Sequence, residues 1–459
     1  MSQYPFSILP LRPELLDNLA SLNYHWMTPI QHESLPIILE GKDLIAQGQT
    51  GSGKTAAFGL GFLQGIDPAR FHVQVLVLCP TRELADQVAQ EIRRLARQIP
   101  NVKTLTLCGG QPLGPQIGSL EHGAHIVVGT PGRVEEHLRK QTLRLDRLQV
   151  LVLDEADRML EMGFQPTVDA IVEQTPSRRQ SLLFSATYPR EIEAIAQRIM
   201  TAPARVEVAS LHQSGTIEQH FHRVDEAERE SALTAVLYHY RPVSAVVFCN
   251  TRKEVRELES ALQQAGIAAV ALHGDLDQRQ RDQTLVRFSN QSATVLVATD
   301  VAARGLDIDG LDLVINYRPA KESQVHVHRI GRTGRAGQSG VAVTLFSDRE
   351  GHKLAGIEAQ LDMVVTEEPL PAARADGNYR PPMATLQLDV GKKQKIRPGD
   401  VLGALTGGAD GIQGDEVGKI RVFDFYTCVA VSRPVAKSAL QKLAQGKIKG
   451  RSCRARQLR

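Results

Sequence analysis

A glycine-rich segment begins at Gly48 and ends with Lys54 and Thr55, two residues that can take part in binding phosphate. The pattern GxxxxGK[ST] turns several backbone N–H groups toward phosphate oxygens, and its glycines permit the tight turn and the close approach of the anion. Lys54 would reach the β- and γ-phosphates of ATP, and Thr55 would hold Mg²⁺ through its hydroxyl. The strand-like run 43–47 and the helix-prone run 54–60 flank the segment, as this motif requires. The segment therefore predicts a nucleotide-binding site.

Two carboxylates, Asp154 and Glu155, follow the apolar run 148–153 directly. Such a run is typical of a buried parallel strand, and ligands of open α/β sheets bind at the carboxyl ends of the strands. We expect Asp154 to fix Mg²⁺ and Glu155 to accept a proton from the attacking water. The dipole of a helix N-terminus can also favour an acidic cluster without any catalytic role. The phosphate-binding segment upstream favours the catalytic interpretation.

Arg332 and Arg335 form a third group, far downstream of the other two. They are three residues apart, so on a helix they would share one face. Arginine suits the charge that grows on a transferring phosphoryl group, because its planar fork is always charged. Taken alone, this spacing is more typical of a solvated helix face. Together with the two upstream groups it predicts an ATPase site divided between two domains, which could open and close.

Further motifs, in order along the chain, resemble those of the DEAD-box RNA helicase family. The matching segments are Thr28–Gln31, Gly48–Thr55, Pro80–Ala85, Gly109–Gly110, Thr130–Arg133, Asp154–Asp157, Ser185–Thr187, Val246–Thr251, Gln278 with Arg281, Ala298–Asp307 and His328–Arg335. The resemblance covers roughly residues 1–365. In this family a glycine often precedes the aromatic residue of the adenine motif, whereas here Asn23 precedes Tyr24. Asparagine tolerates a left-handed backbone, so we expect no loss of function.

The resemblance implies a role for each matching residue at the ATP site. Gln31 would hydrogen-bond the edges of adenine, Phe6 would stack on its ring, and Asp307 would contact the ribose. Arg332 and Arg335 would be the arginine fingers that act with Lys54 and Glu155 in catalysis. The phosphate-binding residues would be Gln49, Gly51, Ser52, Gly53, Lys54 and Thr55, and the ligands of Mg²⁺ would be Thr55 and Asp154.

The resemblance also implies an RNA-binding surface on both lobes. Its residues would be Arg82, Gly110, Thr130 and Arg133 in the first lobe and Arg281 and Thr299 in the second. Ser185–Thr187 would couple hydrolysis to strand separation. His328 would respond to changes on the side of the site that holds Asp157.

Strand and helix patterns alternate along both lobes, which indicates parallel sheets with helices on both faces. The expected strands are 73–79, 126–130, 148–153 and 181–185 in the first lobe, and 245–250, 268–272, 294–298, 313–316 and 340–346 in the second. The resemblance implies an α/β fold with two tandem RecA-like lobes, for which we expect boundaries at 1–206 and 207–366. A proline-rich linker, 367–383, leads to a small α+β domain at 384–459.

The order βαββαβ in 384–459 is that of an RRM-like domain, with a final strand at 447–456. The aromatic RNP1 pattern is absent, and the alternating Phe423 and Phe425 are expected in the core rather than on a stacking platform. RNA recognition would then use loops and the basic residues Lys392, Lys393, Lys447 and Arg451. Some of these lysines and arginines could equally form a solvated surface.

Charge is segregated along the chain, although the net charge is only +3. Residues 384–459 hold fifteen Lys/Arg against six Asp/Glu, and 436–459 hold eight Lys/Arg and no Asp/Glu, which suggests a polyanionic partner. The five cysteines are scattered and odd in number, as expected of free thiols in a reducing compartment. The chain has no run of eighteen apolar residues and no signal-peptide pattern, so we expect a cytoplasmic protein without a membrane partner.

The whole chain resembles the bacterial DEAD-box protein A group, which acts on large-subunit ribosomal RNA. The resemblance implies an ATP-dependent RNA helicase that unwinds short duplexes, is targeted by its last domain to a hairpin of 23S ribosomal RNA, and serves 50S subunit assembly in a pre-ribosomal particle. Two alternatives stay open: an ATP-gated RNA clamp that remodels nothing, and a DNA translocase. Without a coiled-coil or an exposed apolar repeat, we expect a monomer.

Overall fold

The computed structural model describes residues 4–48, 51–188, 190–208, 217–303, 310–334, 340–372, 379–408 and 411–458. These residues divide into two compact units, one up to residue 211 and one from residue 212 onward. Residues 209–216, which follow the predicted boundary between the two lobes at 206 and 207, lie outside the described part.

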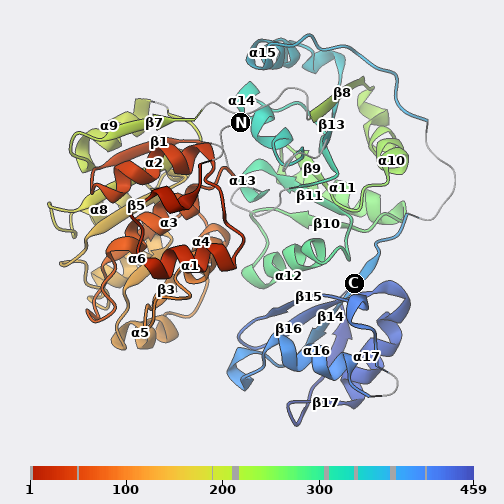
Figure 1. The fold of residues 1–459 in the computed structure, drawn as a ribbon. Coiled ribbons are helices and arrows are strands. Elements are labelled where there is room, and N and C mark those ends of the chain that lie inside the picture. The colour runs from red at the N-terminus through yellow and green to blue at the C-terminus, as the bar shows by residue number, and fades with distance from the viewer. Residues whose placement is uncertain are drawn as a thin grey trace. The chain divides into compact units, whose positions relative to one another are not determined.

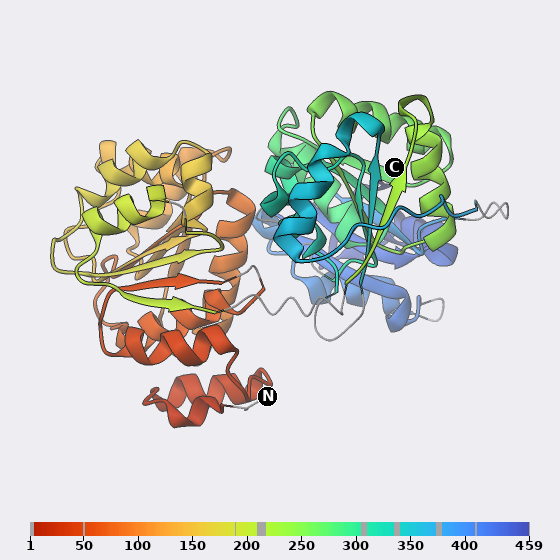
Figure 2. The same cartoon turned by 90° about the horizontal axis from the view of Figure 1, so that it is seen from above.

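The first unit is a parallel seven-stranded sheet with the order β3-β4-β2-β5-β6-β1-β7. Helices cover both faces of this sheet, as Figures 1 and 2 show. Its strands are β1 (Leu44–Gln47), β2 (Val75–Leu78), β3 (Thr104–Leu107), β4 (Ile126–Gly129), β5 (Val150–Asp154), β6 (Gln180–Ser185) and β7 (Ala204–Glu207). Its helices are α1 (Pro13–Ser21), α2 (Pro29–Leu39), α3 (Lys54–Gly65), α4 (Arg82–Leu95), α5 (Leu113–Glu121), α6 (Pro131–Arg139), α7 (Ala156–Glu161), α8 (Gln165–Val172) and α9 (Arg190–Ile199).

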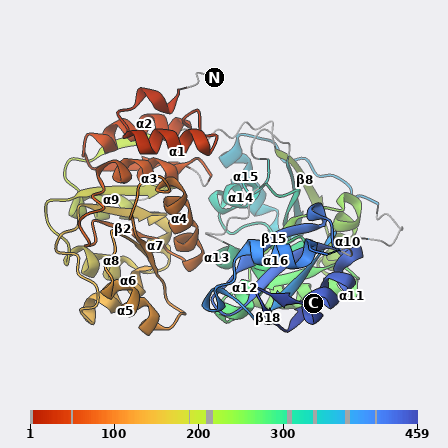
Figure 3. The ribbon, with the colours of Figure 1, turned by 60° about the horizontal axis from the view of Figure 1, so that its bottom comes forward.

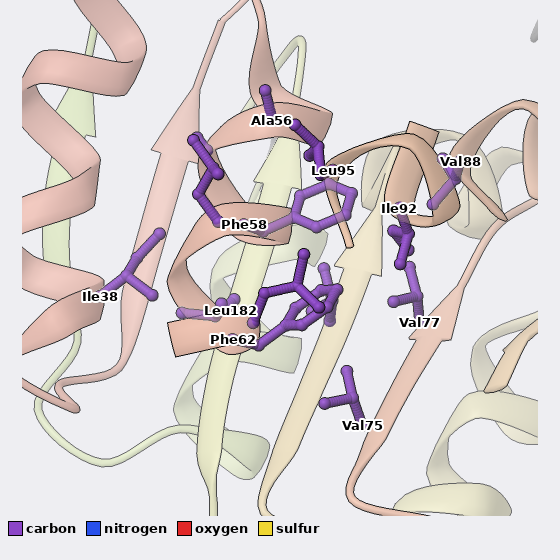
Figure 4. Packing of buried hydrophobic residues seen from close by; sticks show 14 of the residues in the cluster. Ile38, Ala56, Phe58, Phe62, Val75, Val77, Val88, Ile92, Leu95 and Leu182 are labelled. Atoms are coloured by element: carbon purple, nitrogen blue, oxygen red, sulfur yellow. The ribbon is translucent and has the colours of Figure 1, made fainter. Parts of the chain in front are cut away.

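A hydrophobic core beneath α3 and α4 supports the sheet near the phosphate-binding loop. Phe58 and Phe62 of α3 are buried and meet Leu95 of α4 and Val77 of β2 in one hydrophobic cluster (Figure 4). The ring of Phe58 also meets Phe184 of β6 edge to face, with centroids 5.2 Å apart. Aromatic side chains bury large areas, so this cluster fixes α3 against the central strands.

The second unit begins with a parallel six-stranded sheet of order β10-β11-β9-β12-β13-β8. The strands are β8 (Ile217–Arg223), β9 (Ala245–Cys249), β10 (Ala269–Leu272), β11 (Val295–Thr299), β12 (Leu313–Asn316) and β13 (Gly340–Phe346). The helices are α10 (Arg229–Tyr240), α11 (Arg252–Gln264), α12 (Gln278–Ser289), α13 (Asp300–Ala303), α14 (Ser323–Ile330) and α15 (His352–Leu361). Both sheets are parallel with crossover helices, as the alternation in the sequence predicts.

The C-terminal domain has an antiparallel sheet of order β15-β16-β14-β19, which is the strand order of an RRM-like fold. Its elements are β14 (Met383–Leu388), α16 (Pro398–Thr406), β15 (Val417–Val422), β16 (Thr427–Ser432), α17 (Ala436–Gln445), β17 (Lys447–Ile448), β18 (Arg451–Ser452) and β19 (Ala455–Gln457). Figure 3 shows β15, α16 and the chain end of this domain. Apolar side chains of α16, α17 and the sheet form one core cluster.

The final strand predicted at 447–456 is wrong as one element. Residues 447–452 form the separate hairpin β17–β18, and only β19 pairs with β14. Lys449 and Gly450 both have left-handed backbones, with φ of 51° and 78°. Two such residues in succession reverse the chain into a tight turn, which the alternating pattern of side chains does not reveal.

The C-terminal domain packs on α12 through one face of β14, and Figures 1 and 3 both show α12 beside it. Thr385 is fully buried there: its hydroxyl accepts a hydrogen bond from Asn290 Nδ2 at 3.1 Å and lies 2.6 Å from the hydroxyl of Ser292. Gln283 Nε2 donates to Gln387 Oε1 at 3.3 Å. Residues at alternate positions of a strand share a face, so Thr385 and Gln387 turn the outer face of the sheet toward the second lobe.

The end of the predicted linker is also held by the second lobe. Tyr379 is 7% exposed, lies in the second-lobe core and donates its hydroxyl to the carbonyl of Pro242 at 2.7 Å. Arg433 of the C-terminal domain donates to the carbonyl of Pro381 at 2.8 Å. These contacts anchor the chain just before β14.

The structure bears on two predictions made from composition. Within the described ranges, no helix is long and apolar enough to cross a membrane. All five cysteines are buried free thiols. Burial raises the pKa of Cys108 and of Cys428 to about 12, and it raises the pKa of Cys79, Cys249 and Cys453 as well.

Candidate active site and nucleic-acid interface

The phosphate-binding loop joins β1 to α3, as its sequence predicts. Gly51 and Gly53 have φ of 80° and 95°, a region that side chains other than glycine rarely adopt. A Cβ atom added at Gly53 would lie 2.4 Å from Nε2 of Gln31, so the loop forms a close cradle. Lys54 is 7% exposed, and its Nζ donates to the carbonyl of Gly48 at 2.6 Å. Gln49 lies outside the described residues.

Gln31 ties the adenine motif to this loop. Its Nε2 donates to the carbonyl of Gly53 at 3.1 Å, and its Oε1 accepts from the backbone N–H of Thr28 at 2.9 Å. Phe6 lies in the first-lobe core with 4% of its surface exposed. The structure therefore places Gln31 beside the phosphate-binding loop, while the roles of Gln31 and Phe6 toward adenine stay predictions.

Asp154 is the last residue of β5 and is 3% exposed. Burial raises the pKa of Asp154 to about 7, the Lys54 ammonium opposes this rise, and the neighbouring Glu155 carboxylate adds to it. The Thr55 hydroxyl and the Asp154 carboxylate are oxygen donors of the kind that Mg²⁺ prefers. A buried carboxylate whose charge lacks full compensation also fits a site for a cation.

Glu155 follows in a strained backbone conformation, with φ of 52°, at the N-cap position of α7. Its carboxylate Oε2 accepts from Nη1 of Arg158 at 2.6 Å, and both side chains are buried. Sparsely populated conformations of this kind cost free energy and cluster at active sites. Sequence reasoning missed Arg158, although its spacing of three residues from Glu155 on a helix was a usable signal.

Asp157 connects the acidic motif with Ser185–Thr187. Its Oδ2 accepts from the backbone N–H groups of Ala186 and Thr187 at 3.2 and 2.9 Å, and from the Thr187 hydroxyl at 2.9 Å. Three donors on one oxygen make Asp157 sensitive to any movement of this segment. The contact is consistent with the coupling role that the sequence predicts for Ser185–Thr187.

The predicted RNA contacts of the first lobe gather at the carboxyl ends of β2, β3 and β4. The hydroxyl of Thr130 accepts from the backbone N–H of Gly109 at 3.4 Å, and both Nη atoms of Arg133 donate to the carbonyl of Gln111 at 3.0 Å. Gly110 lies between these contacts with φ of 69°. Arg82 begins α4, and its buried Nε and Nη1 have no hydrogen-bond partner among the described residues. Buried donors of this kind are suited to a phosphate oxygen.

The carboxyl edge of the first sheet is thus divided in two. The strand order places β3, β4 and β2, which precede the predicted RNA contacts, on one half of the sheet. β5, β6 and β1, which precede the acidic motif, Ser185–Thr187 and the phosphate-binding loop, lie on the other half. β2 pairs with β5 where the two halves meet, so one rigid edge carries both groups of residues.

In the second lobe, the structure brings Arg281 and Thr299 to one place. Nη2 of Arg281 donates to the carbonyl of Ala302 at 2.9 Å, and the hydroxyl of Thr299 accepts from the backbone N–H of Ala302 at 3.4 Å. Both predicted RNA contacts therefore lie around α13, at the carboxyl end of β11.

The helix that would give the two arginines a shared face does not extend to Arg332. Helix α14 ends at Ile330, and Arg332 lies in the turn that follows it. The chain turns away because the Thr333 hydroxyl donates to the carbonyl of Leu311 and because Gly334 has φ of 66°. Arg335 and Asp307 lie outside the described residues, so the roles of all three stay predictions.

Sequence reasoning also missed Arg329, which is 2% exposed. Its guanidinium donates to Asp300 at 2.6 and 2.7 Å, to Asn250 at 2.9 Å and to Asn316 at 3.1 Å. These partners follow or end three neighbouring strands, so Arg329 fixes the start of the turn that carries Arg332. Its place in a run of basic residues concealed this structural role.

The basic residues of the C-terminal domain are exposed, as expected. They are Lys392, Lys393, Lys447 and Arg451. The segment that carries Lys392 and Lys393 meets the hairpin that carries Lys447 and Arg451 where Nζ of Lys449 donates to the carbonyl of Lys395 at 3.0 Å. Phe425, expected in the core, is 66% exposed, and Phe423 stacks on Tyr426 outside the core cluster, with centroids 4.4 Å apart. This expectation is wrong because the strands end at Val422 and Thr427, so the alternation of strand side chains does not continue through the turn.

Comparison with known proteins follows the same division of the chain. The family model of the DEAD/DEAH box helicases matches residues 28–195, that of the helicase conserved C-terminal domain 228–337, and that of the DbpA RNA binding domain 385–457. The chain is 52% identical over 453 residues to ATP-dependent RNA helicase DbpA of Escherichia coli (strain K12), covering 99% of this chain and 98% of that protein. The chain belongs to the DEAD-box ATP-dependent RNA helicases. Its two parallel-sheet lobes are RecA-like, and its C-terminal domain is an RNA-binding domain of the DbpA type.

Other DEAD-box proteins are similar over the two lobes. The CshA helicase of Bacillus subtilis (strain 168) is 43% identical over 354 residues, covering 77% of this chain and 72% of that protein. A structure of S. cerevisiae Dbp5 bound to RNA and ADP BeF3 superposes with a TM-score of 0.71 at 30% identity, covering 80% of this chain and 96% of that one.

Proposed function

We propose that this DEAD-box helicase unwinds short duplexes in 23S ribosomal RNA and serves assembly of the 50S subunit. The observation that carries this proposal is the match of residues 385–457 to the DbpA RNA binding domain, joined to a complete helicase core. The high identity to DbpA over nearly its whole length supports the same assignment. Ribosomal RNA would be the partner, within a pre-ribosomal particle, and the helicase would act as a cytoplasmic monomer.

In the proposed reaction, Lys54 exchanges its hydrogen bond to the Gly48 carbonyl for phosphate oxygens of ATP. The backbone N–H groups of the loop from Gly51 to Lys54 bind the remaining oxygens. Mg²⁺, which Thr55 and Asp154 would hold, neutralises charge on the phosphates when it is bound. Glu155 accepts the proton of the attacking water, and Arg158 keeps that carboxylate in place.

The proposed cycle couples this chemistry to RNA. Arg332 and Arg335 would complete the ATP site when ATP and RNA are both bound. Asp157 would transmit the resulting movement at the ATP site to Ser185–Thr187 through its three hydrogen bonds. Arg82, Thr130 and Arg133 would bind the RNA backbone at their predicted contacts. Contacts to backbone and sugar carry no sequence information, so specificity would reside in residues 384–459.

Steady-state ATP hydrolysis tests the proposal. Total ribosomal RNA, an unrelated RNA of equal length and a DNA are compared for the whole chain and for residues 1–383. We expect preferential stimulation by ribosomal RNA, and we expect truncation to abolish this preference. We expect Glu155→Gln to retain ATP binding and to lose about 10²- to 10⁴-fold in turnover.

A duplex-unwinding assay separates a helicase from an ATP-gated clamp. Equal stimulation by every RNA would remove the ribosomal assignment, and stimulation by DNA would favour a translocase.

A further inference from the structure

The turn between β15 and β16 exposes an aromatic ring beside basic residues. The strands close at a hydrogen bond from the N–H of Phe423 to the carbonyl of Tyr426, at 2.8 Å, so Asp424 and Phe425 form the tip. Phe425 is 66% exposed. Covering a ring of this size with a partner would be favourable, because it removes apolar surface from water.

The residues around Phe425 in this turn pack against one another. The rings of Phe423 and Tyr426 stack with centroids 4.4 Å apart and an interplanar angle of 18°. The guanidinium of Arg421 lies 5.1 Å from the centroid of the Phe423 ring. Gly391 lies so close that a Cβ atom there would be 2.3 Å from the carbonyl oxygen of Phe423. The turn therefore presents Phe425 on a packed base.

The lysines at 392 and 393 are tied to the same turn through their backbone. The N–H of Lys392 donates to the carbonyl of Phe423 at 2.8 Å, and the N–H of Lys393 donates to the carbonyl of Asp424 at 2.9 Å. Both lysine side chains are exposed. The one carboxylate at the tip is that of Asp424, against two lysines and Arg421. The surface beside Phe425 is therefore positively charged on balance.

This surface continues in two directions. The carbonyl of Lys395 accepts from Nζ of Lys449, which joins the turn to the β17–β18 hairpin with its exposed Lys447 and Arg451. On the other side, Asp282 and Arg279 of α12 are among the charges that act on the hydroxyl of Tyr426, so the turn lies beside the helix that carries Arg281.

We propose that Phe425 stacks on an unpaired RNA base while Lys392 and Lys393 neutralise the adjoining phosphates. An aromatic face flanked by cations is the arrangement that binds single-stranded nucleic acid, because every base has a flat face and every nucleotide a negative charge. The sheet face of this domain is covered around Thr385 and Gln387 by the second lobe, so the turn supplies a platform that this part of the sheet does not. The inference rests on the proposed function, and it assigns a site for unpaired RNA to the turn between β15 and β16.

The test uses the full chain and a short single-stranded RNA with 2-aminopurine at one position, alongside a hairpin RNA with the same base in its loop. Phe425→Leu keeps an apolar side chain without the flat ring, Phe425→Trp keeps the stacking surface, and Phe71→Leu is the control, since Phe71 is 62% exposed on the first lobe. We expect Phe425→Leu to bind either RNA about tenfold more weakly and to lose fluorescence quenching, and the other two variants to match the parent. At saturating RNA, the kcat of ATP hydrolysis in each of these variants should equal that of the parent.

A second measurement addresses the lysines. The double variant Lys392→Gln, Lys393→Gln should lower the slope of log affinity against log salt by about 0.7 for each lost phosphate contact. An unchanged slope would remove the lysines from the site. Equal affinity and quenching in Phe425→Leu and the parent would overturn the stacking, as would equal losses in the leucine and tryptophan variants. Absence of RNA-stimulated hydrolysis in the parent would instead refute the proposed function, and the binding data would show that difference separately.

Discussion

At the scale of single residues, the ATP site depends on side chains that fit against one another without space to spare. Gln31 donates a hydrogen bond to the carbonyl of Gly53, and Lys54 donates one to the carbonyl of Gly48. Arg158 pairs with the carboxylate of Glu155, whose backbone is strained. Each of these contacts joins a motif residue to the backbone or to a neighbouring charge. Side chains fixed in this way lose less conformational freedom when a ligand binds.

The substitution Gly53→Ala tests this tight fit. A Cβ atom there would lie 2.4 Å from Nε2 of Gln31, and the φ of 95° would be strained in alanine. Strain of about 1–3 kcal/mol should weaken ATP binding about 5- to 150-fold, measured as the Kd for a fluorescent ATP analogue. Gly65→Ala, at the other end of α3, is the matched control, because no atom lies within 4 Å of its added Cβ. Equal affinity in the two variants would contradict the tight fit.

At the scale of elements, α14 is fixed by buried polar side chains. His326 is fully buried: its Nε2 lies 3.1 Å from Oε1 of Gln219 on β8 and its Nδ1 lies 3.4 Å from Nδ2 of Asn316 on β12. Burial lowers the pKa of His326 to about 4, and the guanidinium of Arg329 acts in the same direction. The helix that precedes Arg332 is thus held by groups that must stay in one protonation state.

This lowered pKa predicts a pH-dependent stability. Between about pH 4 and 6.5 the unfolded chain binds a proton at His326 that the folded chain does not, so the free energy of unfolding rises with pH in this window. The contribution is complete above pH 6.5 and amounts to about 3 kcal/mol. Urea unfolding near pH 7 and near pH 5 should show a smaller difference in His326→Gln than in the parent. His352→Gln, at an exposed histidine of the same lobe, should retain the full difference, and a matching reduction there would rule out this assignment.

The strands that sequence analysis missed share one property: β3, β7 and β8 all lie at the edges of their sheets. Edge strands are short or polar, as in Ile217–Arg223 with its two histidines, so they lack the continuous apolar run that marks a central strand. Asn23 has φ of 59°, the left-handed backbone that asparagine tolerates, and the expectation that function is retained there stays a prediction. Apolar runs therefore predicted the central strands and the motifs predicted the loops after them, whereas partners such as Arg158 and Arg329 depend on contacts that neither pattern encodes.

At the scale of the whole molecule, the described chain forms two units, and the C-terminal domain belongs to the second. Thr385, Asn290 and Ser292 form its buried polar contact with the second lobe, and Tyr379 anchors the preceding segment. Such an arrangement keeps the RNA-binding domain at a fixed distance from α12. The local concentration of bound RNA near the second lobe should therefore be high.

Thr385→Arg tests this docking. The larger charged side chain cannot be accommodated at a fully buried position between β14 and α12, so the contact should open. Hydrogen–deuterium exchange in Gln278–Ser289 should become faster, while exchange in α3 of the first lobe stays unchanged. Lys437→Gln, at an exposed lysine of α17 in the same domain, is a control that should leave α12 protected. Unaltered exchange of α12 in Thr385→Arg would mean that the docking contributes little.

The burial of all five thiols has a practical consequence for experiments on interdomain motion. The thiolate is the nucleophilic form, and burial disfavours it at every native cysteine, so maleimide dyes should react slowly with the natural protein near neutral pH. A cysteine introduced at an exposed position would then be the fastest-reacting thiol in the chain. Pairs of dyes for distance measurements could be attached without first replacing the native sulfur atoms, and the core that those atoms help to fill would remain intact.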